Sequence, residues 1–549
     1  MTDTRTQVLG RLAQQQFDLL VIGGGIVGAG VARDAAMRGL EVALVEQGDF
    51  AGGTSSKTSK LIHGGLRYLE HGQLGLVRES VRERRVLREV APGLVRPLAL
   101  LLPAYAGDPR PAWKLRAGLW LYDLLAWGRT VQPHRILSAR RALAMEPTLS
   151  AEELRGAGLY GDCQMDDARL CLANVLQAKS FGAACANYVR VQSLIMTVKG
   201  VCGAAVEDTL AQQTFDIRAR VVVNATGPWS DVVRRLSVPD APRRLAPTKG
   251  IHVVLPRIAE RGLFLQSGAD GRMVFVLPWG RVSLVGTTES TVDAPLEHLR
   301  AYRNEVGYLL ELVNRRLPGA HVSEQDVIGT FAGARPLLSF SGRADAASRE
   351  HRIEIDRRGL ISVMGGKYTT YRRMAQQVAD LVAKRVGRAS ERCLTDQVSL
   401  IEELLPVSLE HWRGVTAKLG PETLARLLTR YGVGTSRIVR CLAEEPALAS
   451  QACAHHALLD AELTHAIREE AACTVTDVLA RRTSIAWSSC HGLDLVPKVV
   501  TWLRVLRGVS EDEGARQADD YRRFIAESTL ERERGLRVPD GSAHPASQG

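Results

Sequence analysis

The most constraining stretch of this chain runs from Phe17 to Gln47 and reads FDLLVIGGGIVGAGVARDAAMRGLEVALVEQ. It begins with the apolar run LLVI, passes through glycines into a segment of small and apolar residues, and ends in a second apolar run, EVALVE. Short apolar runs bounded by glycine are typical of buried strands, and the segment between them is long enough for a helix. The stretch therefore predicts a βαβ unit, whose parallel strands require a right-handed crossover.

The turn between the first strand and the helix contains the motif Gly23-x-Gly25-x-x-Gly28. The first glycine permits a tight turn, the second lets a pyrophosphate approach the backbone, and the third allows close packing of helix on strand. The helix N-terminus offers N–H groups and a partial positive charge to phosphates. Glu46 ends the second strand and can accept hydrogen bonds from a ribose. We therefore predict a dinucleotide site, although glycine-rich turns also serve packing alone and the motif does not identify the dinucleotide.

Two later segments favour a flavin. The apolar run VVVN ends in Ala225-Thr226-Gly227, where small side chains let a cofactor pass close to the backbone. Near residue 365 the chain repeats the order of strand, glycine pair and helix start. A second helix N-terminus there can stabilise negative charge on a reduced flavin ring. Each segment alone could be an ordinary tight turn, but together with the first motif they point to a flavin.

The rest of the chain predicts two further regions. Residues 245–335 read as several strands, which we interpret as a sheet-rich domain inserted into the first, and from about residue 395 the apolar spacing is helical. The expected division is an N-terminal extension, 1–16; an FAD-binding domain, 17–80, 155–240 and 350–392; a substrate-binding and membrane-facing domain, 81–154 and 241–349; a helical cap domain, 393–530; and a disordered tail, 531–549.

Composition excludes several classes of protein. The net charge is +11, from 71 Lys and Arg against 60 Asp and Glu, which suits an anionic substrate or an acidic membrane surface; without an RNA- or DNA-binding signature we expect no nucleic-acid partner. The nine cysteines are odd in number and lack CxxC spacing, which argues against a disulfide framework and a metal site and favours the cytoplasm. We find no signal-peptide core and no apolar run of about 18 residues, so we expect no transmembrane helix.

Eight motifs occur in collinear order between about Phe17 and Arg373. They are GGGIVGAG, GTSSKTSKLIHGGLRYLEHG, DCQMDDARL, NATGPW, KGIHVVL, GTTES, GARPL and GGKYTTYR. Together they resemble the FAD-dependent, quinone-linked glycerol-3-phosphate dehydrogenases, and the later stretch ACTVTDVLARRT resembles that family's cap domain. The most specific motif is SSKTSKLIHGGLRYLE. The departures are Thr226, Tyr368 and the polar stretch SGRADAASRE.

This resemblance implies an α/β flavoprotein of the glycine-oxidase/D-amino-acid-oxidase type. It would have a Rossmann-like FAD-binding domain, an inserted antiparallel-sheet substrate domain and a C-terminal helical domain. The implied reaction oxidises sn-glycerol 3-phosphate to dihydroxyacetone phosphate by hydride transfer from C2 to FAD, with the electrons passed to a membrane quinone. The alternatives are a glycerol-3-phosphate oxidase that uses oxygen and a flavin-binding scaffold without turnover.

The resemblance also suggests site residues. Arg335 and Lys367 match phosphate- and substrate-binding positions, and Arg67 and Tyr68 match a second set on the opposite side. We expect His252 to be the general base, because histidine titrates near neutral pH. The expected FAD contacts are Gly23, Gly25, Gly28, Glu46, Thr54, Ser55, Ser56, Ser59, Lys60, His63, Gly64, Gly65, Ala225, Thr226, Gly227, Gly365, Gly366, Lys367 and Thr369.

The roles of the two histidines at this site stay open, and a nearby acidic pair is expected to be structural. His63 is expected to orient the flavin or its loop, but it is also the alternative base, and a purely structural role for either histidine is the competing interpretation. The acidic pair Asp166-Asp167 is expected to tether a loop and to take no part in chemistry.

A tryptophan-rich segment, residues 112–127, reads AWKLRAGLWLYDLLAW. Its tryptophans fall seven residues apart and share one apolar helical face, flanked by basic residues. The segment is either a helix in the bilayer interface or an ordinary core helix; since a quinone dissolves in lipid, we favour membrane contact. Residues 496–508 are a weaker candidate. We expect a cytoplasmic protein bound peripherally to the cytoplasmic membrane, and a homodimer stays open.

Overall fold

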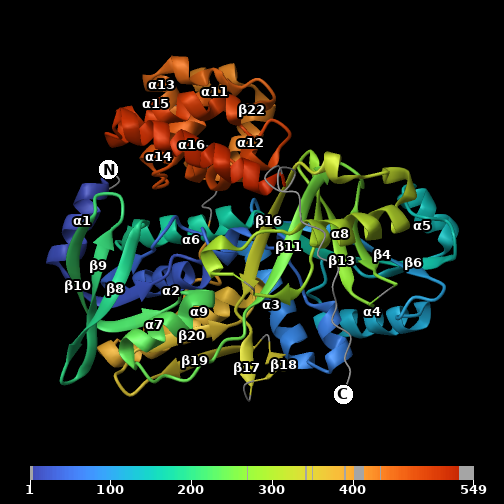
Figure 1. The fold of residues 1–549 in the computed structure, drawn as a ribbon, viewed down its shortest axis with the longest axis horizontal. Helices are drawn as coiled ribbons and strands as arrows, with labels where there is room; N and C mark the ends of the chain where they lie inside the picture. The colour runs from blue at the N-terminus through green and yellow to red at the C-terminus, as the bar shows by residue number, and fades with distance from the viewer. Residues whose placement is uncertain are drawn as a thin grey trace, which may run out of the picture.

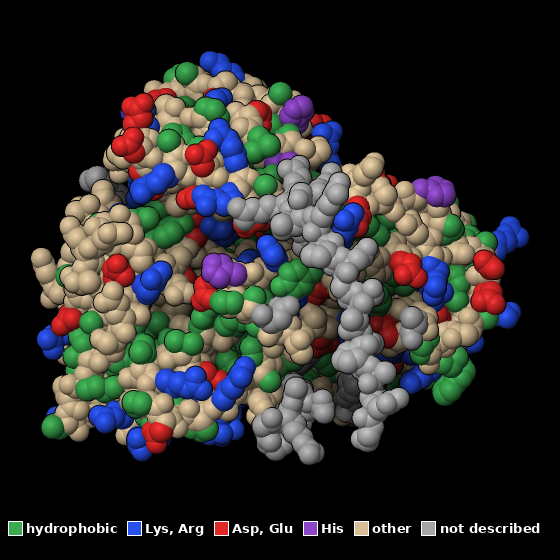
Figure 2. All heavy atoms as spheres, viewed as in Figure 1, with side chains coloured by type: hydrophobic (Ala, Val, Ile, Leu, Met, Phe, Trp, Pro, Cys, Tyr) green, Lys and Arg blue, Asp and Glu red, His purple; other side chains and the backbone are tan. Residues whose placement is uncertain are grey.

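The computed structural model describes residues 4–530 except for 269, 293, 341–342, 349, 389–390, 401–412 and 433. These residues form two lobes, each built on a large sheet, and a helical domain that lies above them in Figure 1. The tail predicted at 531–549 falls outside the described residues. On the face shown in Figure 2, basic and acidic side chains are interspersed, so the positive charge does not gather into one tract there.

The first lobe contains an eight-stranded sheet in the order β19-β20-β10-β1-β2-β7, extended by β9 on β10 and β8 on β9. β1 pairs in parallel with both β2 and β10. The strands are β1 Gln16–Ile22, β2 Val42–Val45, β7 Ala184–Ala186, β8 Val189–Thr197, β9 Gly200–Asp208, β10 Gln213–Asn224, β19 His351–Ile355 and β20 Ile361–Gly365. The predicted βαβ unit is confirmed as β1, α2 and β2.

Helices cover both faces of this sheet (Figure 1). On one face α2 packs against α6 and α9, and its small residues share a core with the sheet. The opposite face holds a second apolar cluster to which α1 and α7 contribute. These helices are α1 Arg5–Gln14, α2 Ile26–Met37, α6 Asp167–Ser180, α7 Ser230–Ser237 and α9 Tyr371–Val386.

The second lobe is built on a ten-stranded, mostly antiparallel sheet in the order β15-β11-β14-β13-β12-β4-β6-β3, with β16 on β11 and β5 on β6. The strands are β3 Leu61–Ile62, β4 Val95–Tyr105, β5 Arg135–Leu137, β6 Leu154–Met165, β11 Thr248–Pro256, β12 Gly262–Gln266, β13 Met273–Trp279, β14 Val282–Gly286, β15 Ser290–Thr291 and β16 Gly329–Arg335. The helices of this half are α3 Leu74–Val90, α4 Ala112–Ala126, α5 Ala139–Met145 and α8 Arg303–Arg316.

Two strands correct the predicted domain boundaries. Residues 61–62 and 155–165 were assigned to the first domain, but they lie in β3 and β6, which pair with each other and, through β6, with β4 in the second sheet. The pairing that decides this joins residues far apart in sequence, such as Leu100 with Tyr160. Local pattern carries no information on such a partner. A short hairpin follows β16, with β17 at Leu338–Phe340 and β18 at Arg343–Ser348.

The C-terminal domain is helical, as its apolar spacing predicts. Its helices are α11 Arg413–Leu419, α12 Pro421–Tyr431, α13 Gly434–Glu444, α14 Asp460–Arg468, α15 Val496–Arg507 and α16 Glu511–Ser528. It also holds a π-helical segment, Asp477–Arg482, and a small hairpin that the sequence did not predict, β21 Gln451–Cys453 and β22 His456–Leu459. No helix in the described part of the chain is long and apolar enough to cross a membrane.

Buried ion pairs dock this domain on the first lobe. Arg169 of α6 donates to both carboxylate oxygens of Glu470, at 2.6 and 2.5 Å. Arg482 donates to both oxygens of Asp49, at 2.6 and 2.7 Å. Burial would raise the pKa of Glu470, but Arg169 outweighs it and holds that pKa well below its usual range. A buried charge is costly once its partner is removed, so these pairs make the domain contact specific.

We expect the substitution Glu470→Gln to destabilise the docked C-terminal domain by about 3–5 kcal/mol, because it leaves the Arg169 guanidinium buried without a counter-charge. The measurement is the free energy of unfolding from a denaturant titration. The exposed pair Arg522–Asp519, 58% and 69% accessible, provides the control, since Asp519→Asn should cost at most ~1 kcal/mol. Equal losses from the two variants would show that the buried pair does not hold the domain.

Candidate functional site

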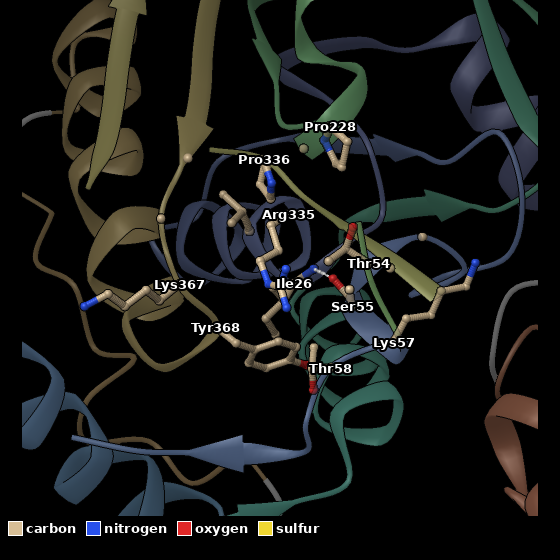
Figure 3. Close-up of a pocket in the computed structure, with 18 of the residues that line it drawn as sticks. Ile26, Thr54, Ser55, Lys57, Thr58, Pro228, Arg335, Pro336, Lys367 and Tyr368 are labelled. Atoms are coloured by element: carbon tan, nitrogen blue, oxygen red, sulfur yellow. Dashed lines mark hydrogen bonds between the residues drawn. The ribbon is translucent and has the colours of Figure 1, made fainter. Parts of the chain in front are cut away.

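A cavity of about 890 Å³ is lined by all three parts of the molecule. The first lobe contributes the β1–α2 turn and the ends of β10 and β20, the second lobe contributes β11 and β16, and the C-terminal domain contributes Arg481. Its volume lies near the upper end of the ~300–1,000 Å³ usual for small-molecule sites, which suits a large cofactor together with a small substrate. Figure 3 shows part of its wall.

The β1–α2 turn gives the cavity its anion-binding end. A methyl group on Gly28 would lie 1.9 Å from the carbonyl oxygen of Gly23, and one on Gly23 would lie 2.8 Å from that of Ala225. Glycine at both positions therefore lets α2 start directly behind β1 and lets the turns after β1 and β10 touch. Ser55 Oγ accepts the Ile26 N–H at 2.9 Å, which fixes the following loop against the start of α2 (Figure 3).

Glu46 stands at the end of β2 and faces the cavity. Its carboxylate accepts the N–H groups of Gly24 at 2.7 Å and Gly48 at 3.0 Å. Burial raises the pKa of Glu46, and the two N–H groups oppose that rise. The carboxylate is thereby held in one orientation, and its remaining lone pairs can accept ribose hydroxyls.

One face of the β11–β16 ladder forms the opposite wall. Because side chains alternate along a strand, Gly250 and His252 share this face of β11, and Gly333 and Arg335 share it on β16. The glycines leave room for neighbouring groups, since a methyl group on Gly333 would lie 2.9 Å from the carbonyl oxygen of Lys57. A methyl group on Gly250 would lie 2.3 Å from Arg335 Nη2, so the guanidinium lies across the strand where a side chain would otherwise stand.

Arg335 is oriented from within the second lobe. Its Nη2 donates to Thr287 Oγ1 and to the Thr288 carbonyl, both at 2.9 Å. Arg335, Ile26 and Ser55 all line the cavity and are labelled in Figure 3. The cavity therefore holds a fixed cation of the second lobe together with the β1–α2 turn of the first.

His252 lies buried beside this cation. Its Nε2 shares a hydrogen bond of 2.8 Å with Ser59 Oγ, and its ring stacks on Phe331 at 5.0 Å between centroids. Its Nδ1 is buried without a hydrogen-bond partner among the described residues. Burial, then the charges of Arg335 and Lys60, hold the pKa of His252 well below its usual range. The imidazole is therefore neutral at pH 7 and able to accept a proton.

The loop at 63–69 meets the turn after β20. Lys367 Nζ lies 3.4 Å from the centre of the Tyr68 ring, a cation–π contact, and Thr369 Oγ1 accepts the N–H of His63 at 3.3 Å. Gly65 has φ +81°, and a side chain there would strike Tyr68. His63, Arg67, Tyr68 and Lys367 all line the cavity.

These features fit a bound dinucleotide, and the comparisons with known proteins agree. Residues 18–381 match the family described as FAD dependent oxidoreductase, and residues 361–514 match the C-terminal domain of alpha-glycerophosphate oxidase. A glycerol-3-phosphate dehydrogenase of Synechocystis sp. is 34% identical, covering 94% of this chain and 97% of its own length. Glycerol-3-phosphate dehydrogenase 2 of Mycobacterium tuberculosis is 36% identical, with 93% and 88% covered.

The chain belongs to the FAD-dependent glycerol-3-phosphate dehydrogenase family. The solved structure of the glycerol-3-phosphate dehydrogenase from Bacillus halodurans complexed with FAD agrees at a TM-score of 0.79 with 29% identity, covering 97% of this chain and 99% of that one. Glycine oxidase from Geobacillus kaustophilus, at a TM-score of 0.53 and 23% identity, covers 68% of this chain and 95% of its own and shares the fold. The predicted family, fold class and FAD dependence are confirmed.

Most residues expected at the FAD site line the cavity, but four do not: Gly28, Ser56, Lys60 and Gly64. Gly28 acts through helix packing. Lys60 Nζ points away to an ion pair with Asp167, at 2.6 Å, and also contacts the Ser56 carbonyl. Gly64 leaves room for Tyr122, since a methyl group would lie 2.0 Å from that hydroxyl. Ser56, Lys60 and Gly64 were expected to contact FAD, and the structure places them outside the lining of the cavity.

Asp167 has the structural role that the sequence suggested. Its carboxylate accepts from the Thr58 N–H at 3.1 Å and the Thr58 hydroxyl at 2.8 Å, in addition to Lys60. Asp166 caps α6 by accepting the Arg169 N–H. Asp167 thus tethers the loop that carries Thr54 to Ser59 along the cavity, while Asp166 fixes the start of α6.

Two cations that line the cavity, Lys57 and Arg481, were not singled out from the sequence. Lys57 lines it, makes no ion pair within the described ranges, and has a pKa lowered to about 8 by burial and by Arg481. Figure 3 shows it on the side away from Lys367. The motif SSKTSK holds two lysines, and sequence alone does not tell which faces the cofactor. Arg481 comes from the C-terminal domain, and nothing in the sequence indicates that it lies near the cavity.

We expect Gly28→Ala to yield folded protein with little bound flavin, because the added methyl group would force α2 away from β1 at the phosphate end. The measurement is the ratio of flavin to protein absorbance after purification, with circular dichroism as the check on folding. Gly10→Ala is the matched control, since a methyl group there meets no atom within 4 Å. A normal flavin ratio in Gly28→Ala would contradict this account of the turn.

Proposed function

We propose that this chain oxidises sn-glycerol 3-phosphate to dihydroxyacetone phosphate with bound FAD and passes the electrons to a membrane quinone. The single observation that carries the proposal is that Arg335 and His252 lie on one face of the β11–β16 ladder, inside the cavity that the β1–α2 turn also lines. A fixed cation beside a neutral imidazole suits a substrate with a phosphate and a hydroxyl to be deprotonated.

Arg335 is proposed to bind the substrate phosphate. Its guanidinium is held by Thr287 and Thr288, so little freedom is lost when the phosphate arrives. Lys367 and Arg67, which also line the cavity, are proposed to neutralise further negative charge. Tyr68 would shield Lys367 from water through their ring contact.

His252 is proposed to take the proton of the C2 hydroxyl. Its neutral state at pH 7 suits that role, and the hydrogen bond to Ser59 fixes the plane of its ring. When bound, FAD supplies the acceptor for the hydride that leaves C2. The phosphate dianion would offset the positive charge that now lowers the pKa of His252, so substrate binding makes this residue a stronger base.

The proposed function is tested by mixing the oxidised holoenzyme with sn-glycerol 3-phosphate without oxygen. Bleaching of the flavin absorbance supports a dehydrogenase or oxidase, whereas unchanged absorbance with FAD bound would favour a scaffold or another substrate. The reduced enzyme is then mixed separately with oxygen and with a soluble quinone analogue. Fast reoxidation by the quinone analogue alone is expected, and fast reoxidation by oxygen alone would overturn the quinone proposal.

We expect Arg335→Ala to raise KM for glycerol 3-phosphate by roughly 10- to 150-fold, because a hydrogen bond to a charged group contributes about 1.5–3 kcal/mol. The flavin ratio should stay normal. Steady-state kinetics measures the change, and Arg522→Ala, at an exposed surface position, is the control. An unchanged KM would remove Arg335 from the phosphate site.

We expect the activity to fall as pH drops below the ordinary histidine range, because the pKa of His252 is lowered and the base form persists until then. Removing the positive charge in Arg335→Gln should move this acidic limb to higher pH. The measurement is kcat/KM against pH in the wild type and in Arg335→Gln. The substrate phosphate ionises in the same way in both assays, so it does not contribute to the difference between them. If the fall of kcat/KM at acidic pH disappears in His63→Gln but persists in His252→Gln, the general base is His63.

We also propose that α4 contacts the membrane, which would put this protein at the cytoplasmic surface as a peripheral protein. The exposed fractions of Trp113, Trp120 and Trp127 are 71%, 67% and 79%, whereas a core helix would bury them. Lys114 and Arg129 flank this face, as anionic headgroups require. In Figure 1, α4 lies on the side of the second lobe away from the C-terminal domain.

The membrane proposal predicts that Trp120→Gln with Trp127→Gln lowers binding to vesicles rich in anionic lipid several-fold, because the tryptophans sit at headgroup depth. Co-sedimentation with the vesicles is the measurement. The control is Val505→Gln on α15, which is 68% exposed, since α15 buries Val499 and Leu503 in the core of its own domain. If only Val505→Gln loses vesicle binding, then α15 and not α4 contacts the membrane.

A further inference from the structure

Three metal-ligating side chains of the C-terminal domain converge outside the FAD cavity. Cys453, His456 and Cys490 each offer a ligand atom, and these atoms lie within 4.8 Å of one another. The two sulfur atoms are 3.9 Å apart. Two thiolates on one tetrahedral zinc ion, with Zn–S bonds of about 2.3 Å, stand about 3.8 Å apart. The distance between the two sulfur atoms is thus already that of a zinc site.

The local backbone supports both sulfur atoms in the same way. Cys453 ends β21 and His456 begins β22, so they flank the two-residue turn of a hairpin. The His455 N–H donates to Cys453 Sγ at 3.5 Å, and the Gly492 N–H donates to Cys490 Sγ at 3.5 Å. Each sulfur therefore accepts the amide two residues ahead. Such hydrogen bonds stabilise thiolates and orient metal ligands.

The histidine is also prepared for coordination. His456 Nε2 is buried without a hydrogen-bond partner in the part of the chain that the structure describes. A buried nitrogen without a partner is costly, and a metal bond would satisfy it.

We propose that Cys453, His456 and Cys490 bind one Zn²⁺, with the Asp494 carboxylate or a water molecule in the fourth position. Asp494 Oδ1 lies 3.8 Å from Cys453 Sγ. Because Asp494 is exposed, the fourth coordination position of the zinc ion would face solvent. Soft sulfur and imidazole ligands favour Zn²⁺ over Mg²⁺ or Ca²⁺. On binding, each of the two thiols releases its proton to the buffer and forms a Zn–S bond, with no change in oxidation state.

The proposed ion would join two separate segments of the C-terminal domain. One is the β21–β22 hairpin, and the other is the turn between η10 Ile485–Trp487 and η11 Leu493–Leu495. Within that turn the carbonyl of His491 accepts from Tyr521 of α16, so the site adjoins the core of the domain. We therefore assign the ion a structural role, separate from the chemistry of the FAD cavity.

The test measures zinc in the whole FAD-containing protein. The holoenzyme is kept in a phosphine reductant, stripped by a chelator, given a small excess of ZnCl2 and desalted before metal analysis. We expect about one zinc ion per chain in the wild type. We expect most of it to be lost in Cys490→Ser and in His456→Ala, and part of it in Asp494→Asn. The matched control, Cys202→Ser, alters a thiol of β9 in the first lobe and should keep its zinc.

A second measurement needs no variant and covers the case in which the substituted proteins fail to fold. The reduced wild type is alkylated with and without ZnCl2, and the modified cysteines are identified by mass spectrometry. Protection of Cys453 and Cys490 by zinc, with Cys202 unaffected, supports the site. No zinc uptake by the reduced wild type would overturn the proposal. A Cys453–Cys490 disulfide in peptide maps, together with absence of zinc uptake after reduction, would likewise overturn it and make the pair a thiol–disulfide couple.

Discussion

The contact between Gly28 and the carbonyl of Gly23 is the constraint on which the rest of the structure depends. It lets α2 begin directly behind β1, the strand that pairs with both β2 and β10. Because Gly23 also touches Ala225, the turns after β1 and β10 form one continuous floor. Any side chain at these positions would separate helix from sheet and close the place where phosphates meet the helix N-terminus.

The site itself is assembled across domains. The first lobe supplies the glycine-rich floor of the cavity. The second supplies Arg335 and His252 from two adjacent antiparallel strands, whose glycines leave room for the Arg335 guanidinium and for the Lys57 backbone. The C-terminal domain adds Arg481 and is fixed by buried charge pairs such as Arg169 with Glu470. The buried ion pairs therefore hold the C-terminal domain in one orientation. The cations that line the cavity create a positive potential where an anionic cofactor and substrate would bind.

The same cations set the state of the proposed base. Arg335 and Lys60 add to burial in lowering the pKa of His252, which keeps the imidazole neutral. Lys60 contributes from a distance, because it is itself paired with Asp167 behind the cavity wall. The charges of Arg335 and Lys60 thus both lower the pKa of His252 through space, and a phosphate bound to Arg335 would reverse part of that effect.

The sequence by itself determined the βαβ unit, the dinucleotide turn, the family and the helical C-terminal domain, because glycine spacing and apolar periodicity are constraints between near neighbours. Only the tertiary structure decided which polar side chains meet. It turned Lys57 toward the cavity and Lys60 toward Asp167, placed β6 beside β4, and brought Cys490 to Cys453 across 37 residues. Those outcomes depend on strand register and on packing between distant segments, which no local pattern encodes.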